Sequence, residues 1–237
     1  VMVLDNEIPF TNYIRPICLL SEDLGLNDGV VVAWGKDDKS NKAHENIPKK
    51  LKIPITPNED CYRENSKLAE ISWPKSFCAG HPGVGVCRGD SGGGFYVRSG
   101  NKYYFKGFVS SSSTSASNLD FGTDCFTTNF AIYTDVVKYS EFIGVQQESC
   151  GVMSSDASLI IGGKSSSREL FPWFVSISKY SNGEFRYFGT GSLVSTKHIV
   201  SKADTVAWPS NDRTKILIAV DVCLLYTSDA ADDLLCV

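Results

Sequence analysis

Residues 87–94 read Cys-Arg-Gly-Asp-Ser-Gly-Gly-Gly, and this run places a serine hydroxyl between glycines and beside a cysteine. A serine hydroxyl is a weak nucleophile until a neighbouring base takes its proton. Glycine permits the tight turn that exposes such a hydroxyl, because it adopts backbone conformations closed to other residues. The run therefore indicates acyl-transfer chemistry at Ser91, and the alternative is a flexible surface loop.

The sequence on either side supports the chemical interpretation. Phe-Cys-Ala-Gly at 77–80 precedes the run, and Lys-Gly-Phe-Val-Ser at 106–110 follows it, then a cysteine and Ala-Ile-Tyr-Thr-Asp-Val at 131–136. In this order and spacing, the motifs resemble the C-terminal half of a chymotrypsin-like serine protease of the trypsin family. Within that family they are most similar to arthropod proteases. The resemblance implies an all-β fold, a chymotrypsin-like double antiparallel β-barrel.

Composition and charge limit the kinds of protein that this chain can be. The chain has 237 residues, 42% of them hydrophobic, and a net charge of −4, which suits a globular protein and gives no support for nucleic-acid binding. Its apolar runs are too short to span a bilayer, so we expect no membrane partner. The eight cysteines show no metal-ligand spacing and indicate disulfides. We therefore expect a secreted, extracellular protein without a metal or other cofactor.

Short β-type runs separated by turn residues dominate the first 145 residues and predict an antiparallel barrel. The expected strands lie within 30–35, 51–55, 94–97, 103–109 and 131–133. The apolar spacing of 136–145 predicts a closing helix. Residues 1–145 are thus expected to form the C-terminal half of a serine protease domain, with only its C-terminal barrel and closing helix present.

A second, weaker resemblance follows a linker at 146–159. Ile-Ile-Gly-Gly at 160–163, with Pro-Trp at 172–173, resembles the mature N-terminus of the same family. Residues 160–221 are expected to form the N-terminal part of a second protease domain. Residues 222–237 no longer follow the family pattern and are similar to translated vector read-through, so we expect an artefact there. A genuine divergent strand is the alternative.

The resemblance implies roles around the first run. Ser91 would be the nucleophile, and the backbone N–H groups of Gly89 and Ser91 would form the oxyanion hole. Asp90 would pair with a new N-terminal ammonium group after proteolytic cleavage, so an upstream activating protease is an expected partner besides a polypeptide substrate. In the family the catalytic histidine and aspartate precede the serine, which places them before Val1. The chain alone is therefore expected to be inactive.

The implied substrate pocket departs from the common pattern. Its residues would be Gly85, Ser110, Ser111, Ser112 and Ala131. Gly85 stands at the pocket floor, where trypsin-like enzymes carry an aspartate, so a preference for Lys or Arg is disfavoured. Ser111 replaces a tryptophan, while Ser112 and Ala131 replace glycines. The pocket is expected to be apolar or mildly polar and to suit uncharged side chains.

The resemblance also implies disulfide pairings. Cys61 would pair with Cys78, and Cys87 with Cys125. Cys18 would pair with a cysteine of a preceding segment that lies off the chain. Cys150 would bond within the missing remainder of the second unit.

The second unit has lost its expected base. Lys-Ala-Asp-Thr at 202–205 stands where the family has Ala-Ala-His-Cys, which puts Asp204 at the base position. An aspartate has the wrong reach and basicity for that role. Two functions stay open: a secreted serine endopeptidase that hydrolyses peptide bonds through an acyl-enzyme on Ser91, and a noncatalytic protease homologue that acts as a binding or regulatory module.

Overall fold

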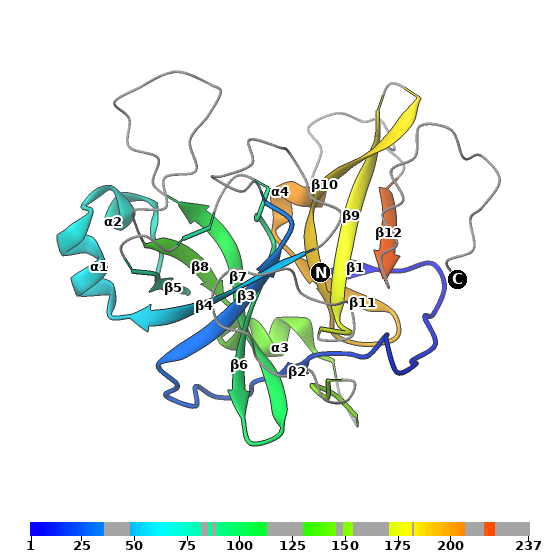
Figure 1. Ribbon diagram of the computed structural model, residues 1–237, viewed down its shortest axis with the longest axis horizontal. Coiled ribbons are helices and arrows are strands. Elements are labelled where there is room, and N and C mark those ends of the chain that lie inside the picture. Colours follow the sequence, from blue (N-terminus) through cyan, green and yellow to red (C-terminus); the bar gives the residue numbers. More distant parts are fainter. Residues whose placement is uncertain are drawn as a thin grey trace.

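The computed structural model describes nine ranges of the chain, which form two sheets lying side by side (Figure 1). Their strand pairings are antiparallel except for a parallel pairing of Cys18–Leu19 with Tyr104–Phe105. The ranges are 1–35, 48–81, 85–86, 89–112, 130–145, 149–153, 171–181, 183–206 and 216–220. Helices in them are few and short. The predicted all-β, double-barrel class is confirmed.

The first sheet closes into a barrel. Its strands are β2 (Cys18–Leu19), β3 (Asp28–Ala33), β4 (Lys49–Thr56), β5 (Ser76–Ala79), β6 (Gly94–Ser99), β7 (Lys102–Ser112) and β8 (Ala131–Asp135). They follow the order β2-β7-β6-β3-β4-β5-β8, and a further pairing of β7 with β8 closes the ring. Five of these strands cover the runs predicted from the sequence, whereas β2 and β5 were not predicted.

The apolar run of β3 is continuous because the strand is buried on both faces. Val31 joins Phe95 in the core inside the barrel. Val30, Val32 and the following Trp34 belong instead to a core shared with the second sheet. Alternate residues of β3 thus belong to two different cores, because successive side chains of a strand point to opposite faces of the sheet.

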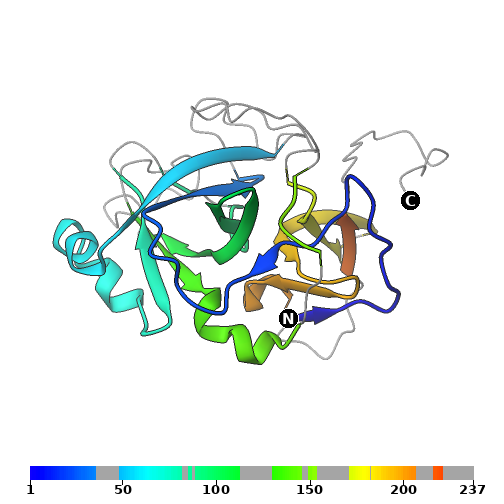
Figure 2. The same ribbon diagram turned by 90° about the horizontal axis from the view of Figure 1, so that it is seen from below.

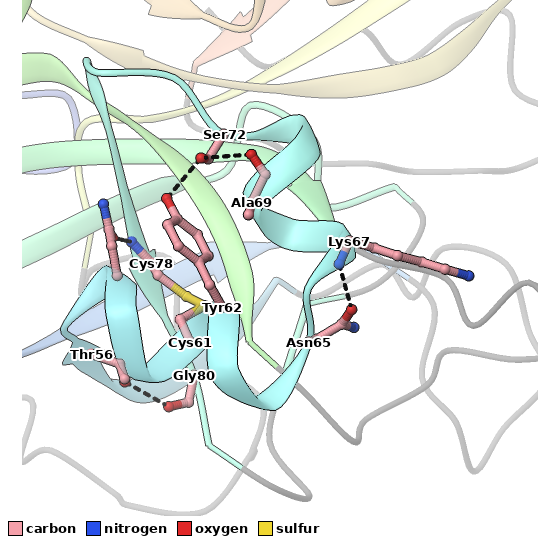
Figure 3. The surroundings of a disulfide bond; sticks show 10 residues. Thr56, Cys61, Tyr62, Asn65, Lys67, Ala69, Ser72, Cys78 and Gly80 are labelled. Carbon is pink, nitrogen blue, oxygen red and sulfur yellow. Dashed lines mark hydrogen bonds between the residues drawn. A yellow bond between two sulfur atoms is a disulfide. The ribbon is translucent and has the colours of Figure 1, made fainter.

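Two short helices, α1 (Asn58–Glu64) and α2 (Lys67–Ile71), connect β4 to β5. A disulfide joins Cys61 of α1 to Cys78 of β5, and this is the pair that the resemblance implies (Figure 3). Beside it, the Tyr62 hydroxyl donates to Ser72 Oγ at 2.7 Å, which ties the end of α2 to α1. The region is therefore fixed to the barrel by a covalent bond and by polar contacts.

The barrel ends in a 3-10 helix, η1 (Val136–Tyr139), followed by α3 (Ser140–Ile143). Asp135 begins η1, and its carboxylate accepts a hydrogen bond from the Val137 N–H at 3.2 Å. Gly144 ends α3 in the left-handed conformation, with φ of 62°, which glycine adopts without strain. The helix predicted within 136–145 is thus present in two short parts.

The second sheet draws on both ends of the chain. Its strands are β1 (Met2–Val3), β9 (Phe174–Ser181), β10 (Glu184–Leu193), β11 (His198–Ser201) and β12 (Ile216–Val220), and α4 (Ala203–Val206) follows β11. The order is β1-β11-β10-β9-β12, so β1 pairs with a strand nearly two hundred positions later (Figure 2). In the described part of the chain this sheet is open, with β1 and β12 as its edges.

One hydrophobic core joins the two sheets. Its buried members come from both parts of the chain and include Ile17, Val32, Tyr96, Phe171, Trp173, Leu193 and Ile199. Trp173 is fully buried and packs against the rings of Tyr96, Tyr103 and Phe171. Backbone bonds from Arg15 N to Pro172 O (3.0 Å) and from Ile17 N to Leu193 O (2.9 Å) add to the contact.

A second disulfide corrects the sequence analysis. Cys18 was expected to pair with a segment off the chain and Cys150 with a missing remainder, but the two cysteines are bonded to each other. Gly151, next to Cys150, lies between the segment before β2 and the start of β7. Its N–H donates to Pro16 O at 2.8 Å, and its carbonyl accepts from Tyr103 N at 2.8 Å. The segment before the second unit is therefore held on the first barrel, which spacing alone could not indicate.

Candidate active site

The turn that carries Ser91 leads directly into β6. The Gly93 N–H donates to Asp90 O at 2.8 Å, which closes the turn around the serine. Gly89 and Gly92 have φ of 94° and 78°, where other residues are strained. The turn is attached to β7 because Gly92 N donates to Val109 O (3.0 Å) and Val109 N donates to Gly93 O (2.9 Å). The glycines predicted to permit a tight turn therefore do so.

The Asp90 side chain is partly buried. Its Oδ1 accepts a hydrogen bond from the Gly35 N–H at 2.6 Å. Burial raises the pKa of the Tyr133 hydroxyl, and the negative charge of Asp90 raises it further. The carboxylate is therefore partly buried beside Gly35. Its expected role, the ion pair between Asp90 and a new N-terminal ammonium group, stays a prediction.

The second sheet covers one side of the serine turn. The Thr190 N–H donates to Ser91 O at 3.3 Å. A Cβ added at Gly92 would overlap Thr190 O and would lie 2.6 Å from Ser201 Oγ. Sequence reasoning missed Thr190 and Ser201, because their proximity to the turn arises only when residues far apart in the chain fold together.

The structure brings two predicted pocket residues together. Ser112 of β7 pairs directly with Ala131 of β8, and Ser111 pairs with Ile132. The register shifts between Val109 and Ser111, so Ser110 occupies a bulge. Gly85 is partly buried.

Two other predicted positions lie outside the described residues. Cys87 and Cys125 fall there, so their disulfide stays a prediction.

Helix α4, which carries Asp204 at the position of the family's histidine, approaches the serine turn. A Cβ added at Gly189 would be 2.6 Å from Thr205 Cγ2 and 3.3 Å from Ser91 O, so α4 approaches the turn through β10. Asp204 itself has a side chain 64% exposed and forms an ion pair with Lys202 at 2.7 Å. Among the described residues, the Ser91 hydroxyl has no hydrogen bond to a base.

The described histidines have other surroundings. His198 Nδ1 lies 2.7 Å from Ser195 Oγ, in the turn that connects β10 to β11. His81 is exposed. In the ranges that the structure describes, no group of three His, Cys, Asp or Glu side chains could hold a metal ion. No described helix has the length and apolar composition that a membrane crossing requires.

Comparison with known proteins agrees with this geometry. The family model described as Trypsin matches residues 1–143. The chain is 27% identical to serine protease gd of Drosophila melanogaster, with 60% of this chain and 33% of that protein covered. It is 32% identical to phenoloxidase-activating factor 1 of Holotrichia diomphalia (59% and 37% covered) and 33% identical to phenoloxidase-activating factor 3 of that species (55% and 36%).

This chain spans about a third of the length of these curated relatives. The trypsin model nevertheless covers more than half of the chain. The matched residues include the closed barrel, the serine turn and the strands of the expected pocket. The chain therefore belongs to the trypsin family of chymotrypsin-like serine proteases, and its relatives are arthropod proteins.

Proposed function

We propose that the chain is the nucleophile-bearing part of a secreted serine endopeptidase that hydrolyses peptide bonds through an acyl-enzyme on Ser91. The observation that carries the proposal is the serine turn: Gly89 and Gly92 have positive φ, Gly93 N donates to Asp90 O, and the Asp90 carboxylate accepts from Gly35 N. A flexible surface loop, the alternative for this motif, would lack these contacts.

In the proposed reaction Ser91 Oγ attacks the carbonyl carbon of the scissile peptide, and its proton passes to a histidine expected before Val1. The negative oxygen of the tetrahedral intermediate accepts hydrogen bonds from the N–H groups of Gly89 and Ser91. The protonated histidine then gives its proton to the leaving amine. Water, deprotonated by the same base, hydrolyses the ester and restores the hydroxyl.

The proposed substrates are polypeptides cleaved after an uncharged side chain. Ser112 and Ala131 lie opposite each other on β7 and β8, and Gly85 provides no carboxylate for a cationic side chain. Secretion is supported by the disulfides Cys18–Cys150 and Cys61–Cys78, because such bonds persist in oxidising compartments. Cleavage by another protease would supply the ammonium group expected to pair with Asp90.

A fluorophosphonate probe tests the proposal on the full-length, processed protein. We expect covalent labelling of Ser91, identified by mass spectrometry, and none in Ser91→Ala. The matched control is Ser99→Ala, an exposed serine at the end of β6, which leaves labelling unchanged. A correctly processed protein without an adduct at Ser91 rules out the endopeptidase.

A noncatalytic homologue is the second candidate, and the position of α4 favours it. Asp204 stands on a helix that approaches the serine turn, with an ion pair to Lys202 in place of a contact with Ser91. Within the described part of 171–206 the histidine, His198, bonds Ser195. If no other part of the full-length protein brings a histidine to Ser91, the serine stays unlabelled. A protein that is folded, processed and unlabelled is the result expected for this candidate.

A further inference from the structure

A chain of hydrogen bonds leads from the second sheet to the serine turn. The Tyr187 hydroxyl donates to Gly89 O at 3.0 Å and lies 2.8 Å from Thr190 Oγ1. The Ser201 hydroxyl donates to Thr190 O at 2.6 Å. All three of these side chains belong to β10 and β11, whereas Gly89 belongs to the first part of the chain.

The direction of each bond follows from the number of protons. The Tyr187 hydroxyl has a single hydrogen, and it is directed at Gly89 O. The Thr190 hydroxyl must therefore donate to the Tyr187 oxygen. Burial raises the pKa of Tyr187, while its bond with Thr190 lowers it and the charge of Asp90 raises it again. The raised pKa keeps the Tyr187 hydroxyl protonated at neutral pH, so it can donate to Gly89 O.

Three successive carbonyl groups of the turn are held in this way. Gly89 O accepts from Tyr187, Asp90 O accepts from Gly93 N, and Ser91 O accepts from Thr190 N. Since a peptide group is planar and trans, fixing a carbonyl also fixes the N–H on its opposite side. The bond to Asp90 O therefore orients the Ser91 N–H. The bond to Gly89 O likewise orients the Asp90 N–H and restricts rotation about ψ of Gly89, a residue with many accessible conformations because it has no side chain.

We propose that Tyr187 is a positioning residue for the oxyanion turn: through its hydroxyl, and supported by Thr190, the second sheet holds the peptide between Gly89 and Asp90 and so limits rotation at Gly89, whose N–H is a proposed donor to the oxyanion. The proposal rests on the proposed function, because the oxyanion hole belongs to that reaction. In this proposal Tyr187 acts through the Gly89 carbonyl. Its ring keeps a separate packing role against Trp34, with centroids 5.8 Å apart.

Hydrogen exchange of the full chain tests the positioning directly. Tyr187→Phe removes the donor and keeps the ring, and we expect the amides of residues 89–92 to exchange about fivefold to tenfold faster. Amides of β6 and β7 are expected to keep their rates. Tyr180→Phe is the matched control, since Tyr180 lies on the neighbouring strand with an exposed side chain, and it should leave the turn unchanged.

Thr190 provides a second pair of variants. Thr190→Val removes the hydroxyl that orients Tyr187 and should speed exchange in the turn as Tyr187→Phe does. Thr190→Ser keeps a hydroxyl, so the amides of the turn should exchange at the same rates as in the unaltered protein. Unchanged turn exchange in Tyr187→Phe overturns the proposal, and so does an equal acceleration throughout the barrel, which would indicate only a structural role.

Kinetics of the full-length, processed protein separate this proposal from the function on which it rests. In Tyr187→Phe we expect kcat to fall about tenfold with KM unchanged, because an oxyanion hole acts in the transition state. A proportional rise in KM with constant kcat contradicts positioning. If the unaltered protein never labels at Ser91, the proposed function fails, while the exchange rates still decide whether Tyr187 holds the turn.

Discussion

The closed barrel and the open sheet are stabilised in different ways. The barrel has its own interior core, with Val31, Phe77, Phe95 and Tyr133 among its members, and a disulfide that links two of its elements. The open sheet buries its apolar side chains mainly in the core shared with the barrel. A closed sheet has no free edge, whereas an open one needs a partner. The comparison indicates that the open sheet depends on the barrel more than the barrel depends on the open sheet.

The two disulfides offer the strongest way to sharpen this comparison. Cys18 and Cys150 enclose 132 positions, while Cys61 and Cys78 enclose 17. Loop-closure entropy predicts a loss of about 5 kcal/mol when the long loop is opened by paired alanines, and about 3 kcal/mol for the short one. Denaturant unfolding of the two double variants measures both losses. An equal loss from both would contradict the entropic account.

Removal of Trp173 should separate the two regions. Trp173→Ala empties the middle of the shared core and is expected to cost about 3 to 5 kcal/mol. Because the barrel keeps its interior core, its strands should retain protection from hydrogen exchange while β9 and β10 lose theirs. Phe95→Ala, inside the barrel, should instead expose both regions. Identical exchange patterns in the two variants would show a single cooperative unit.

The ion pair between Lys106 and Asp135 is buried, and its removal should give the next largest loss of stability. Lys106 is 4% exposed and contacts Asp135 at 3.2 Å and Asp23 at 2.7 Å. Lys106→Met leaves the buried Asp135 carboxylate without its cation, and we expect a loss of about 3 kcal/mol from the free energy of unfolding. Lys52→Met is the control, because its pair with Asp28 is exposed and should change stability by less than about 1 kcal/mol.

The smallest expected effect depends on pH. The hydrogen bond from Lys106, opposed by burial, lowers the pKa of Asp23 below its usual 3.8. Because the folded pKa is the lower one, this stabilisation is present above about pH 4 and is lost as the pH falls through the folded value. Asp23→Asn should therefore cost less than about 1 kcal/mol at pH 7, since Asp23 is half exposed, and progressively less as the pH falls below about 4. Urea unfolding at pH 7 and at low pH measures the difference, and a larger loss at low pH would contradict it.

Sequence reasoning identified the elements that depend on neighbouring residues. The strand that contains Val30–Ala33 and the glycine turn around Ser91 could be predicted, because their apolar pattern and their backbone requirements are local. Helices α1 and α2 have only short, mostly polar sequences and gave no periodic signal. The bond from Cys18 to Cys150 could not be predicted, since spacing does not fix which cysteines meet.

The candidate site shows the same limit. Ser91, Gly89 and Asp90 could be identified from one continuous motif, whereas Tyr187 and Thr190 lie about a hundred positions later. Their contacts with the turn appear only when Tyr96 of the barrel and Ser192 of the open sheet come together, at 2.8 Å between hydroxyls. A contact between residues so far apart in the chain leaves no pattern in the neighbouring sequence.

The shared core has a consequence for the growing polypeptide. Trp34, Tyr96 and Phe105 leave the ribosome well before Trp173 and Ile199, which cover them in the finished molecule. At roughly 5 to 20 residues per second, synthesis of the intervening hundred residues takes about 5 to 20 s. Throughout that interval an aromatic face of the nascent barrel is exposed to water, and it is a surface to which a chaperone would bind.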